Sequence, residues 1–321
     1  AGSYRGGVNR SPAMRVAAIV VAYNGGEALV RCVRALLASV YRGLDVVVVD
    51  NASIDDSIVP LEGDGLDIVR LPENRGFAGG VNAGIEYHVE HRGGADIYAL
   101  VNQDCLVAPG WLGALVVTLM GEPGVAVVGA RLYAEDGLTL QHAGARVAAN
   151  GLTEHIGRGE VDAGAYVAPA DVDYVTGALC AFTYEAWRSH GPFDERFFPA
   201  YFEEVDFCVR CRRAGRRVVY VPESEGVHLE GHVLGAGSPA FLAAYHAGRV
   251  RFAVEHLLVR GAMFRALRTE AAWLLSLRRR QEILPVLAAY AALPRLLSER
   301  RRNRKHAPHR RSYGAAPGAR A

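Results

Sequence analysis

Polar residues that could bind a phosphorylated ligand follow three apolar stretches of this sequence. Each group stands where a buried strand would end. The groups are Tyr23 and Asn24, Asp50 and Asn51, and Asn102, Gln103 and Asp104. Strand ends in an open α/β sheet face the crevice that binds ligands. One group alone has a structural explanation, since Asp50 could cap the turn that follows it. The convergence of all three favours a ligand site.

Two further groups could supply a metal ligand and a base. Asp104 offers oxygen to a hard cation such as Mg²⁺ or Mn²⁺, which shares its remaining ligands with substrate phosphates. His228 could add a nitrogen, which would favour Mn²⁺, although a lone histidine is more often structural. Glu203, Glu204 and Asp206 begin a predicted helix, where they could complement the helix dipole or provide a general base.

A glycine-rich segment, ENRGFAGGVNAGI at 73–85, could let the backbone approach a ligand closely. Gly76, Gly79 and Gly80 carry no side chain, and Arg75 could neutralise an anion. The same pattern also suits a glycine-rich helix start. A P-loop and an ordinary dinucleotide-binding site are excluded, because the sequence lacks G-x-x-x-x-G-K-[ST] and no G-x-G-x-x-G follows the first strand.

The elements that must position these residues follow an alternating pattern. Apolar strands at 16–22, 44–50, 66–71, 96–101 and 125–130 alternate with helical segments at 26–40, 79–90 and 109–120. Such alternation predicts an α/β fold with a mostly parallel sheet covered on both faces. The 131–180 segment predicts shorter antiparallel pieces, followed by a helix at 203–214, a strand at 216–222 and amphipathic helices over 240–300. Those last helices could pack on the main domain or on a membrane surface.

The amino-acid composition bears on the size of the core and on the cellular compartment. Half of the 321 residues are apolar, which is enough for a sizeable core. The five cysteines are too few and too irregular for a disulfide framework, and no secretory signal is visible, so we expect a cytoplasmic protein. Cys208 and Cys211 form a C-x-x-C in a helical pattern without a second pair. Helix packing is therefore favoured over a zinc or redox site.

Four segments are expected along the chain. They are an unstructured leader or expression remnant at 1–14, the main domain at 15–235, a C-terminal helical region at 236–300 and a basic disordered tail at 301–321. From residue 295 onward nine Arg or Lys stand against Glu299, a net of +8 in a chain whose total is +2. The tail could be merely solvated, or could contact anionic lipid or nucleic acid. Nucleic acid is the least favoured partner, because Tyr313 is the tail's only stacking aromatic.

The motifs together resemble glycosyltransferase family 2, specifically its rhamnosyltransferase-like branch. They occur in the family's order over about residues 15–235, and they are VVAYN, VVVVDNAS, ENRGFAGGVNAGI, LVNQDCLV, YVTGALCAF, FDERFFPAYFEEVDFCVRCRRAG and then His228. The resemblance implies a GT-A fold with a Rossmann-like sheet and a C-terminal helical extension. It also implies a nucleotide-diphosphate sugar donor, a divalent cation (Mn²⁺ or Mg²⁺) and inversion at the anomeric carbon.

The resemblance assigns a nucleotide-sugar site to the strand ends and the glycine-rich segment. Asp50 stands where it would accept the imide N–H of uracil or thymine, so the expected donor is a UDP- or dTDP-sugar, with dTDP-rhamnose as the best match. The expected nucleotide-sugar contacts are Tyr23, Asn24, Asp50, Asn51, Arg75, Gly80, Asn82, Asn102 and Gln103.

The same resemblance assigns the metal and the base. The NQD tripeptide stands where the family has its D-x-D motif, and only its last acid, Asp104, survives, as in the Asn-Pro-Asp form of this branch. His228 matches a histidine that joins the metal. Glu203 and Glu204 match an acidic pair whose second member is the base, with Glu in place of the commoner Asp. Asp206 is the third acid, and Arg210 one turn later gives it a structural explanation.

Two other functions compete with an inverting transferase. Sugar nucleotidyltransferases share the architecture, but AYNGGEALVRC lacks the basic glycine-rich loop that they carry after the first strand. A non-catalytic module that binds lipid or nucleic acid would rest on the basic tail alone. The acceptor, whether a glycan, a lipid-linked sugar or a small molecule, has no readable code. The expected location is the cytoplasm, with peripheral contact to the inner face of an anionic membrane.

Overall fold

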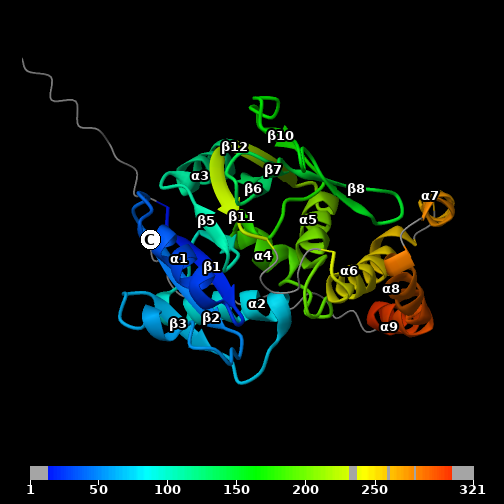
Figure 1. Cartoon of the computed structure of the whole chain (residues 1–321), viewed down its shortest axis with the longest axis horizontal. Coiled ribbons are helices and arrows are strands. Elements are labelled where there is room, and N and C mark those ends of the chain that lie inside the picture. The colour runs from blue at the N-terminus through cyan, green and yellow to red at the C-terminus, as the bar shows by residue number, and fades with distance from the viewer. Residues whose placement is uncertain (1–13, 231–236, 259–260, 278–279, 306–321) are drawn as a thin grey trace, which may run out of the picture.

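A computed structural model describes residues 14–230, 237–258, 261–277 and 280–305 (Figure 1). Its centre is a ten-stranded sheet in the order β10-β12-β6-β11-β4-β1-β2-β3, with β5 beside β12 and β7 beside β6. The strands are β1 Val16–Ala22, β2 Leu44–Asp50, β3 Asp67–Arg70, β4 Ile97–Val101, β5 Cys105–Val107, β6 Val125–Tyr133, β7 Leu140–His142, β10 Ala170–Asp171, β11 Leu179–Thr183 and β12 Arg217–His228. Strands β8 Ala145–Val147 and β9 Thr153–His155 form a separate hairpin.

The strand ends predicted to carry the site do lie along one edge of the sheet. Strands β3, β2, β1 and β4 are parallel, and in the β1–β2 ladder Ala22 pairs with Asp50. All seven residues of β1 are buried, as its unbroken apolar run predicts for a strand covered on both faces. Beyond β4 the sheet is mixed, because β11 runs antiparallel between β4 and β6.

Helices cover both faces of this sheet. They are α1 Gly26–Leu37, α2 Gly76–Arg92, α3 Trp111–Gly121, α4 Tyr184–His190, α5 Glu203–Arg213, α6 Pro239–Phe252, α7 Met263–Ser276, α8 Arg280–Ala291 and α9 Leu293–Lys305, with a 3₁₀ turn at Val59–Leu61 and a π-helical segment at Ala253–Leu257. Helices α1 and α3 pack into one core cluster, and α2, α4 and α5 pack into the other. The α5 cysteines, Cys208 and Cys211, are buried free thiols within that second core, as the packing interpretation expects.

Several predicted boundaries need correction. Helix α2 begins at Gly76 rather than 79, and α1 ends at Leu37 rather than 40. The chain leaves α1 early because Val40 N–H donates to the Pro109 carbonyl, which ties the following turn to another loop. Helix α9 continues to Lys305, so the tail expected from residue 301 overlaps its last turn. The leader at 1–13 and the tail at 306–321 lie outside the described residues.

The C-terminal helices are joined to the main domain through α6. Phe252 belongs to the same core cluster as α5, and the buried Arg249 guanidinium donates to Glu270 of α7 at 2.8 Å and to the Asn150 carbonyl at 3.3 Å. Helices α7 and α8 leave apolar side chains uncovered, with Phe264 79% and Leu275 90% exposed. In the described part of the chain, no helix combines the length and the apolar character that crossing a bilayer would need.

Candidate active site

An antiparallel strand pair brings the predicted metal ligands together across 124 residues of sequence. Strand β5 follows directly after Asp104 and pairs with the end of β12, where Cys105 stands opposite His228. His228 Nε2 lies 3.2 Å from Asp104 Oδ1 and 3.3 Å from Asn102 Nδ2. Leu229 N–H donates to the Asp104 carbonyl at 3.0 Å, which fixes the two chain segments side by side.

The Asp104 and His228 side chains fit a divalent cation that takes most of its ligands from elsewhere. No described group of three or more His, Cys, Asp or Glu side chains could hold a metal ion by itself. Two protein ligands suit a cation that is completed by water and by the phosphates of a bound nucleotide. A carboxylate oxygen with an imidazole nitrogen is a donor pair accepted by Mn²⁺ and, less readily, by Mg²⁺.

Three buried amides that were predicted to contact the nucleotide instead hold the site's backbone. Gln103 clamps Tyr23 through both backbone groups, at 2.8 Å to the N–H and 3.2 Å to the carbonyl. Asn51 accepts from Arg75 N–H and donates to the Gly76 carbonyl and to Asn74.

Asn82, the third of these amides, pairs with both backbone groups of Phe193 at 2.9 and 3.0 Å. All three amides are at least 96% buried, and both ends of each are engaged by protein. Gln103, Asn51 and Asn82 therefore support the backbone of the site in this structure, and their contact with a nucleotide stays a prediction.

The predicted backbone approach at Gly80 is also corrected. A Cβ atom built at Gly80 would lie 2.6 Å from Cγ1 of Val21, so the space beside it is filled by strand β1. Gly80 is required because helix α2 packs closely on β1. Glycine is required at position 76 for a different reason. Its φ is +71°, and a Cβ atom would lie 2.7 Å from the Pro199 carbonyl oxygen.

Tyr23 and Asn24 follow the end of β1, and Asp50 is the last residue of β2. Asp50 is partly exposed, and its Oδ1 accepts from Ser53 N–H at 2.9 Å, which is the turn-capping contact that its position also predicts. Asn24 has φ of 50°, and its side chain accepts from Ile54 N–H at 2.9 Å. These bonds join the loop after β1 to the loop after β2. They leave the Asp50 carboxylate oriented by the backbone at the end of its strand.

Arg75 has a partner that the sequence did not indicate. Its Nη2 donates to Glu195 Oε1 at 2.8 Å, and both side chains are partly exposed. Glu195 also accepts from Asn82 at 3.2 Å. The charge expected to neutralise a phosphate therefore has a counter-ion within the protein, which engages one nitrogen of the Arg75 guanidinium.

Glu203 and Glu204 enter the site on a strained turn. Tyr201 and Phe202, which precede them, have φ of 80° and 77°, a left-handed conformation that costs a non-glycine residue free energy and that concentrates at functional sites. One oxygen of each carboxylate, Oε2, is buried without a hydrogen bond among the described residues. Burial raises the pKa of Glu204 to about 7. The pKa of Glu203 is raised well above its usual value, first by burial and then by the neighbouring charge of Glu204.

Tyr201 lies near acidic residues of both parts of the candidate site. Burial raises the pKa of its phenol, and the nearby carboxylates of Glu203, Glu230, Glu204 and Asp104 raise that pKa further. The acidic pair on α5 and Asp104 at the sheet edge are therefore both near enough to act on the charge of this phenol. Sequence reasoning missed Tyr201, although it lies within the quoted FDERFFPAYFEEVDF motif, two residues before Glu203.

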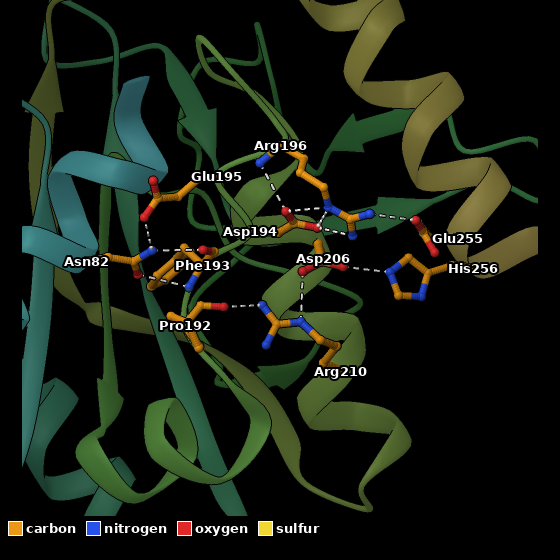
Figure 2. Close-up of a pocket in the computed structure, with 10 residues that line it drawn as sticks. All are labelled: Asn82, Pro192, Phe193, Asp194, Glu195, Arg196, Asp206, Arg210, Glu255 and His256. Carbon is orange, nitrogen blue, oxygen red and sulfur yellow. Dashed lines mark hydrogen bonds and ion pairs between the residues drawn. The ribbon is translucent and has the colours of Figure 1, made fainter. Parts of the chain in front are cut away.

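Asp206 lines a pocket together with Arg210 and His256 (Figure 2). Its Oδ2 accepts from Arg210 Nε at 2.7 Å, and its Oδ1 lies 2.7 Å from His256 Nε2. Burial alone would raise the Asp206 pKa, but the Arg210 charge and the His256 hydrogen bond outweigh it and lower that pKa. Both oxygens are committed, so Asp206 joins α5 to the C-terminal helices and is removed from the candidate catalytic residues.

Comparison with known proteins decides the family. A model described as glycosyl transferase family 2 matches residues 17–220, well over half of the chain. The chain belongs to glycosyltransferase family 2. This confirms the resemblance read from the motifs, and it disfavours the sugar nucleotidyltransferase alternative.

The sequence relatives of this family 2 chain are matched over part of their length. The chain is 31% identical over 205 residues to the uncharacterized protein y4gI of Sinorhizobium fredii, a match that covers 60% of this chain and 22% of that protein. It is 34% identical over 84 residues to an N-acetylglucosaminyl-diphospho-decaprenol L-rhamnosyltransferase of Mycobacterium tuberculosis, covering 26% of this chain and 27% of the relative. The chain thus spans 22–27% of the length of the curated relatives that it matches.

Solved structures of similar shape confirm the GT-A fold. GalNAc-T7 with UDP, GalNAc and Mn²⁺ superposes with a TM-score of 0.62 at 16% identity, over 81% of this chain and 51% of that one. The mannosyltransferase PcManGT of Pyrobaculum calidifontis, in complex with GDP-Man and Mn²⁺, gives a TM-score of 0.53 at 20% identity, over 95% and 77% of the two chains. At these identities the likeness establishes the fold alone.

Proposed function

We propose that this chain is an inverting, metal-dependent glycosyltransferase that moves a sugar from a pyrimidine nucleotide-diphosphate donor to an acceptor hydroxyl. The observation that carries the proposal is the 3.2 Å pairing of Asp104 Oδ1 with His228 Nε2 at the sheet edge. Asp104 and Glu204 also both act on the charge of the Tyr201 phenol. A metal-ligand pair and a carboxylate with a raised pKa in one cleft are the two components that such a transfer requires.

Each of these residues has a separate task. Asp104 and His228 would hold Mn²⁺ or Mg²⁺. The bound cation would supply positive charge to the departing nucleotide diphosphate. Glu204, on the α5 side, would take the proton from the acceptor hydroxyl as its oxygen attacks the anomeric carbon. The bond from the sugar to the diphosphate breaks as the new glycosidic bond forms, so a single displacement inverts the configuration and needs no nucleophilic side chain.

The donor is inferred from Asp50 and from the rhamnosyltransferase likeness. The Asp50 carboxylate, held by Ser53 N–H, can accept a hydrogen bond from the imide N–H of uracil or thymine. Rhamnose, and hence dTDP-rhamnose, is favoured by the motif pattern and by the Mycobacterium tuberculosis relative, whose match covers a quarter of this chain.

The acceptor side of the proposal is a lipid-linked sugar at an anionic membrane surface on the cytoplasmic side. The name of the same relative describes a lipid-linked acceptor. The basic stretch from residue 295 and the uncovered apolar residues of α7 and α8 supply the cations and apolar side chains that interfacial binding uses.

Slow donor hydrolysis tests this function without knowledge of the acceptor. The full chain is incubated with dTDP-rhamnose, UDP- and GDP-sugars, in Mn²⁺ and then in EDTA, and the released nucleotide diphosphate is measured. We expect hydrolysis of a pyrimidine donor in Mn²⁺ and none in EDTA, with Asp104→Asn as the inactive control. Preference for a GDP-sugar would refute the assignment of a pyrimidine nucleobase to the donor. Turnover by Asp104→Asn in EDTA would refute the metal-dependent mechanism.

A further inference from the structure

Gln141, on the short strand β7, contacts His228 through both ends of its side-chain amide. Its Nε2 donates to the His228 carbonyl at 2.8 Å, and its Oε1 lies 2.9 Å from His228 Nδ1. The residue is 9% exposed, and β7 is held in the sheet by its pairing with β6. The Gln141 carbonyl lies 3.3 Å from Nδ1 of His155, which gives the strand a further attachment.

The carbonyl of His228 fixes the orientation of the Gln141 amide. A backbone carbonyl can only accept a hydrogen bond, so the amide NH₂ must face it and the amide oxygen must face the imidazole. An amide oxygen also only accepts, so His228 Nδ1 must carry the proton in that contact. In the neutral ring the other nitrogen, Nε2, then carries the lone pair.

That lone pair is on the nitrogen that faces the metal site. His228 Nε2 lies 3.2 Å from Asp104 Oδ1 and 3.3 Å from Asn102 Nδ2, as described above. Asn102 Nδ2 can donate to a lone pair, which agrees with the same tautomer. Asp104 Oδ1 only accepts, so in this tautomer Asp104 and His228 present lone pairs to the same space, as two ligands of one cation do. The opposite tautomer would place a proton on Nε2, and a protonated nitrogen cannot bind a cation.

We propose that Gln141 is a positioning residue that holds His228 in the Nδ1–H tautomer, so that Nε2 is ready to bind the cation. The inference rests on the proposed function, because it takes His228 as a metal ligand. It goes further in assigning a role to a residue of the 131–170 stretch, which contains none of the quoted family motifs. Residues that orient a metal-binding histidine through its second nitrogen typically change metal affinity 10- to 100-fold when removed, so we expect an effect of about that size.

Two readouts test Gln141 without any turnover. Nitrogen-15 NMR of histidine-labelled, metal-free protein at pH 8 reports the tautomer of His228, whose signal is identified by its loss in His228→Gln. Electron paramagnetic resonance of free Mn²⁺ reports the dissociation constant. We expect the Nδ1–H tautomer in the wild type, and in Gln141→Met we expect increased Nε2–H tautomer and about 10- to 100-fold weaker Mn²⁺ binding.

Two further variants separate positioning from stability. Gln141→Glu keeps an oxygen for Nδ1–H but loses the NH₂ that donates to the His228 carbonyl. It should therefore retain more of the Nδ1–H tautomer and of the Mn²⁺ affinity than Gln141→Met does. Leu140→Val alters the neighbouring β7 residue, whose buried side chain has no bond to His228. It should lower the melting temperature and leave Mn²⁺ affinity unchanged.

The outcomes distinguish this inference from the function on which it rests. If the wild type shows the Nε2–H tautomer, or if His228→Gln weakens Mn²⁺ binding while Gln141→Met does not, the positioning role is wrong and the metal site stands. If His228→Gln binds Mn²⁺ as tightly as the wild type, the ligand assignment itself fails and the inference falls with it.

Discussion

Glu203 and Glu204 are adjacent in sequence and both have a raised pKa, but the shift of Glu203 is the larger, and that difference selects the base. Glu203 is 97% buried, and burial together with the neighbouring charge of Glu204 raises its pKa well above the usual value. Glu204 is only partly buried as a residue, and its pKa is raised to about 7. The member of the pair that ionises first is the one able to accept a proton at neutral pH.

We predict that Glu204→Gln loses about 10²- to 10⁴-fold in kcat, the usual contribution of positioned proton transfer. Donor and Mn²⁺ affinity should stay near wild type, because the amide keeps the size of the side chain. Steady-state kinetics and calorimetric donor titration measure the two effects. Glu203→Gln is the matched control on the preceding residue, and a collapse there with normal turnover in Glu204→Gln would transfer the role.

The pH profile of kcat gives a second prediction with a defined sign. A base works only when deprotonated, so kcat should rise as pH increases through about 7, the pKa of Glu204, and level off above it. The residual activity of Glu204→Gln should lack this rise. An unchanged profile in that variant would mean that another group titrates.

At the scale of residues, the sequence predicts the side chains that are proposed to act directly on the metal or the substrate. Asp104, His228 and the acidic pair stand in recognisable motifs, and the structure brings Asp104 and His228 together. The supporting amides could not be identified. Asn82 resembles a ligand contact in sequence because its partner, Phe193, lies 111 residues away and only the folded chain brings them together. Gln141 has no sequence signal at all, since its role depends on a strand pairing that no local pattern encodes.

At the scale of elements, helix α2 must lie close to strand β1 for the cleft to form. We predict that Gly80→Ala destabilises the fold by about 1–3 kcal/mol, because the added Cβ would meet the stiff Val21 side chain at 2.6 Å. Gly113→Ala in helix α3 is the control, since no atom lies within 4 Å of its Cβ position. That substitution should stabilise the fold by about 0.5–1 kcal/mol.

Urea unfolding of the two alanine variants measures both changes on one scale. Equal stability of Gly80→Ala and the wild type would show that α2 can move away from β1 without cost. In that case the first expectation, that a ligand approaches the Gly80 backbone closely, would again need to be considered.

The parallel half of the sheet was predicted from its strands almost to the residue, because continuous Val and Ile runs buried on both faces have few alternatives. Strand β11 was expected only as an undefined antiparallel piece. Its insertion between β4 and β6 depends on long-range pairing, in which Ala181 lies beside Ala99 on one side and Val128 on the other. The pairing of β5 with β12, which completes the metal site, was likewise invisible in the local pattern.

At the scale of the whole molecule, only part of the positive charge at the C-terminal end has a described role in the fold. Arg300 is 92% buried and donates to the Leu258 carbonyl, and Arg295 pairs with Glu299, so these two cations belong to the folded helices. A truncation at Arg295 would also remove Leu296 from the core. The membrane test must therefore keep residues up to Arg300.

We predict that deleting residues 301–321 weakens binding to vesicles that contain anionic lipid and leaves donor hydrolysis unchanged. The deletion removes seven Arg or Lys and no acidic residue, and each cation near an anionic surface contributes about 1 kcal/mol. Sedimentation with anionic and with neutral vesicles, at two salt concentrations, measures the effect. Equal binding of the full-length and shortened chains would end the proposal of a membrane role for the tail.

The central claim is that Asp104 and His228 hold a cation that binds the donor's diphosphate. Calorimetric titration of the full chain with UDP or dTDP, in Mn²⁺ and in EDTA, tests it most directly, with Asp104→Ala measured beside the wild type. The account predicts clear binding by the wild type in Mn²⁺, loss of that binding in EDTA, and no Mn²⁺-dependent binding by Asp104→Ala. Equally tight binding of the nucleotide by the wild type in EDTA, or by Asp104→Ala in Mn²⁺, would contradict it.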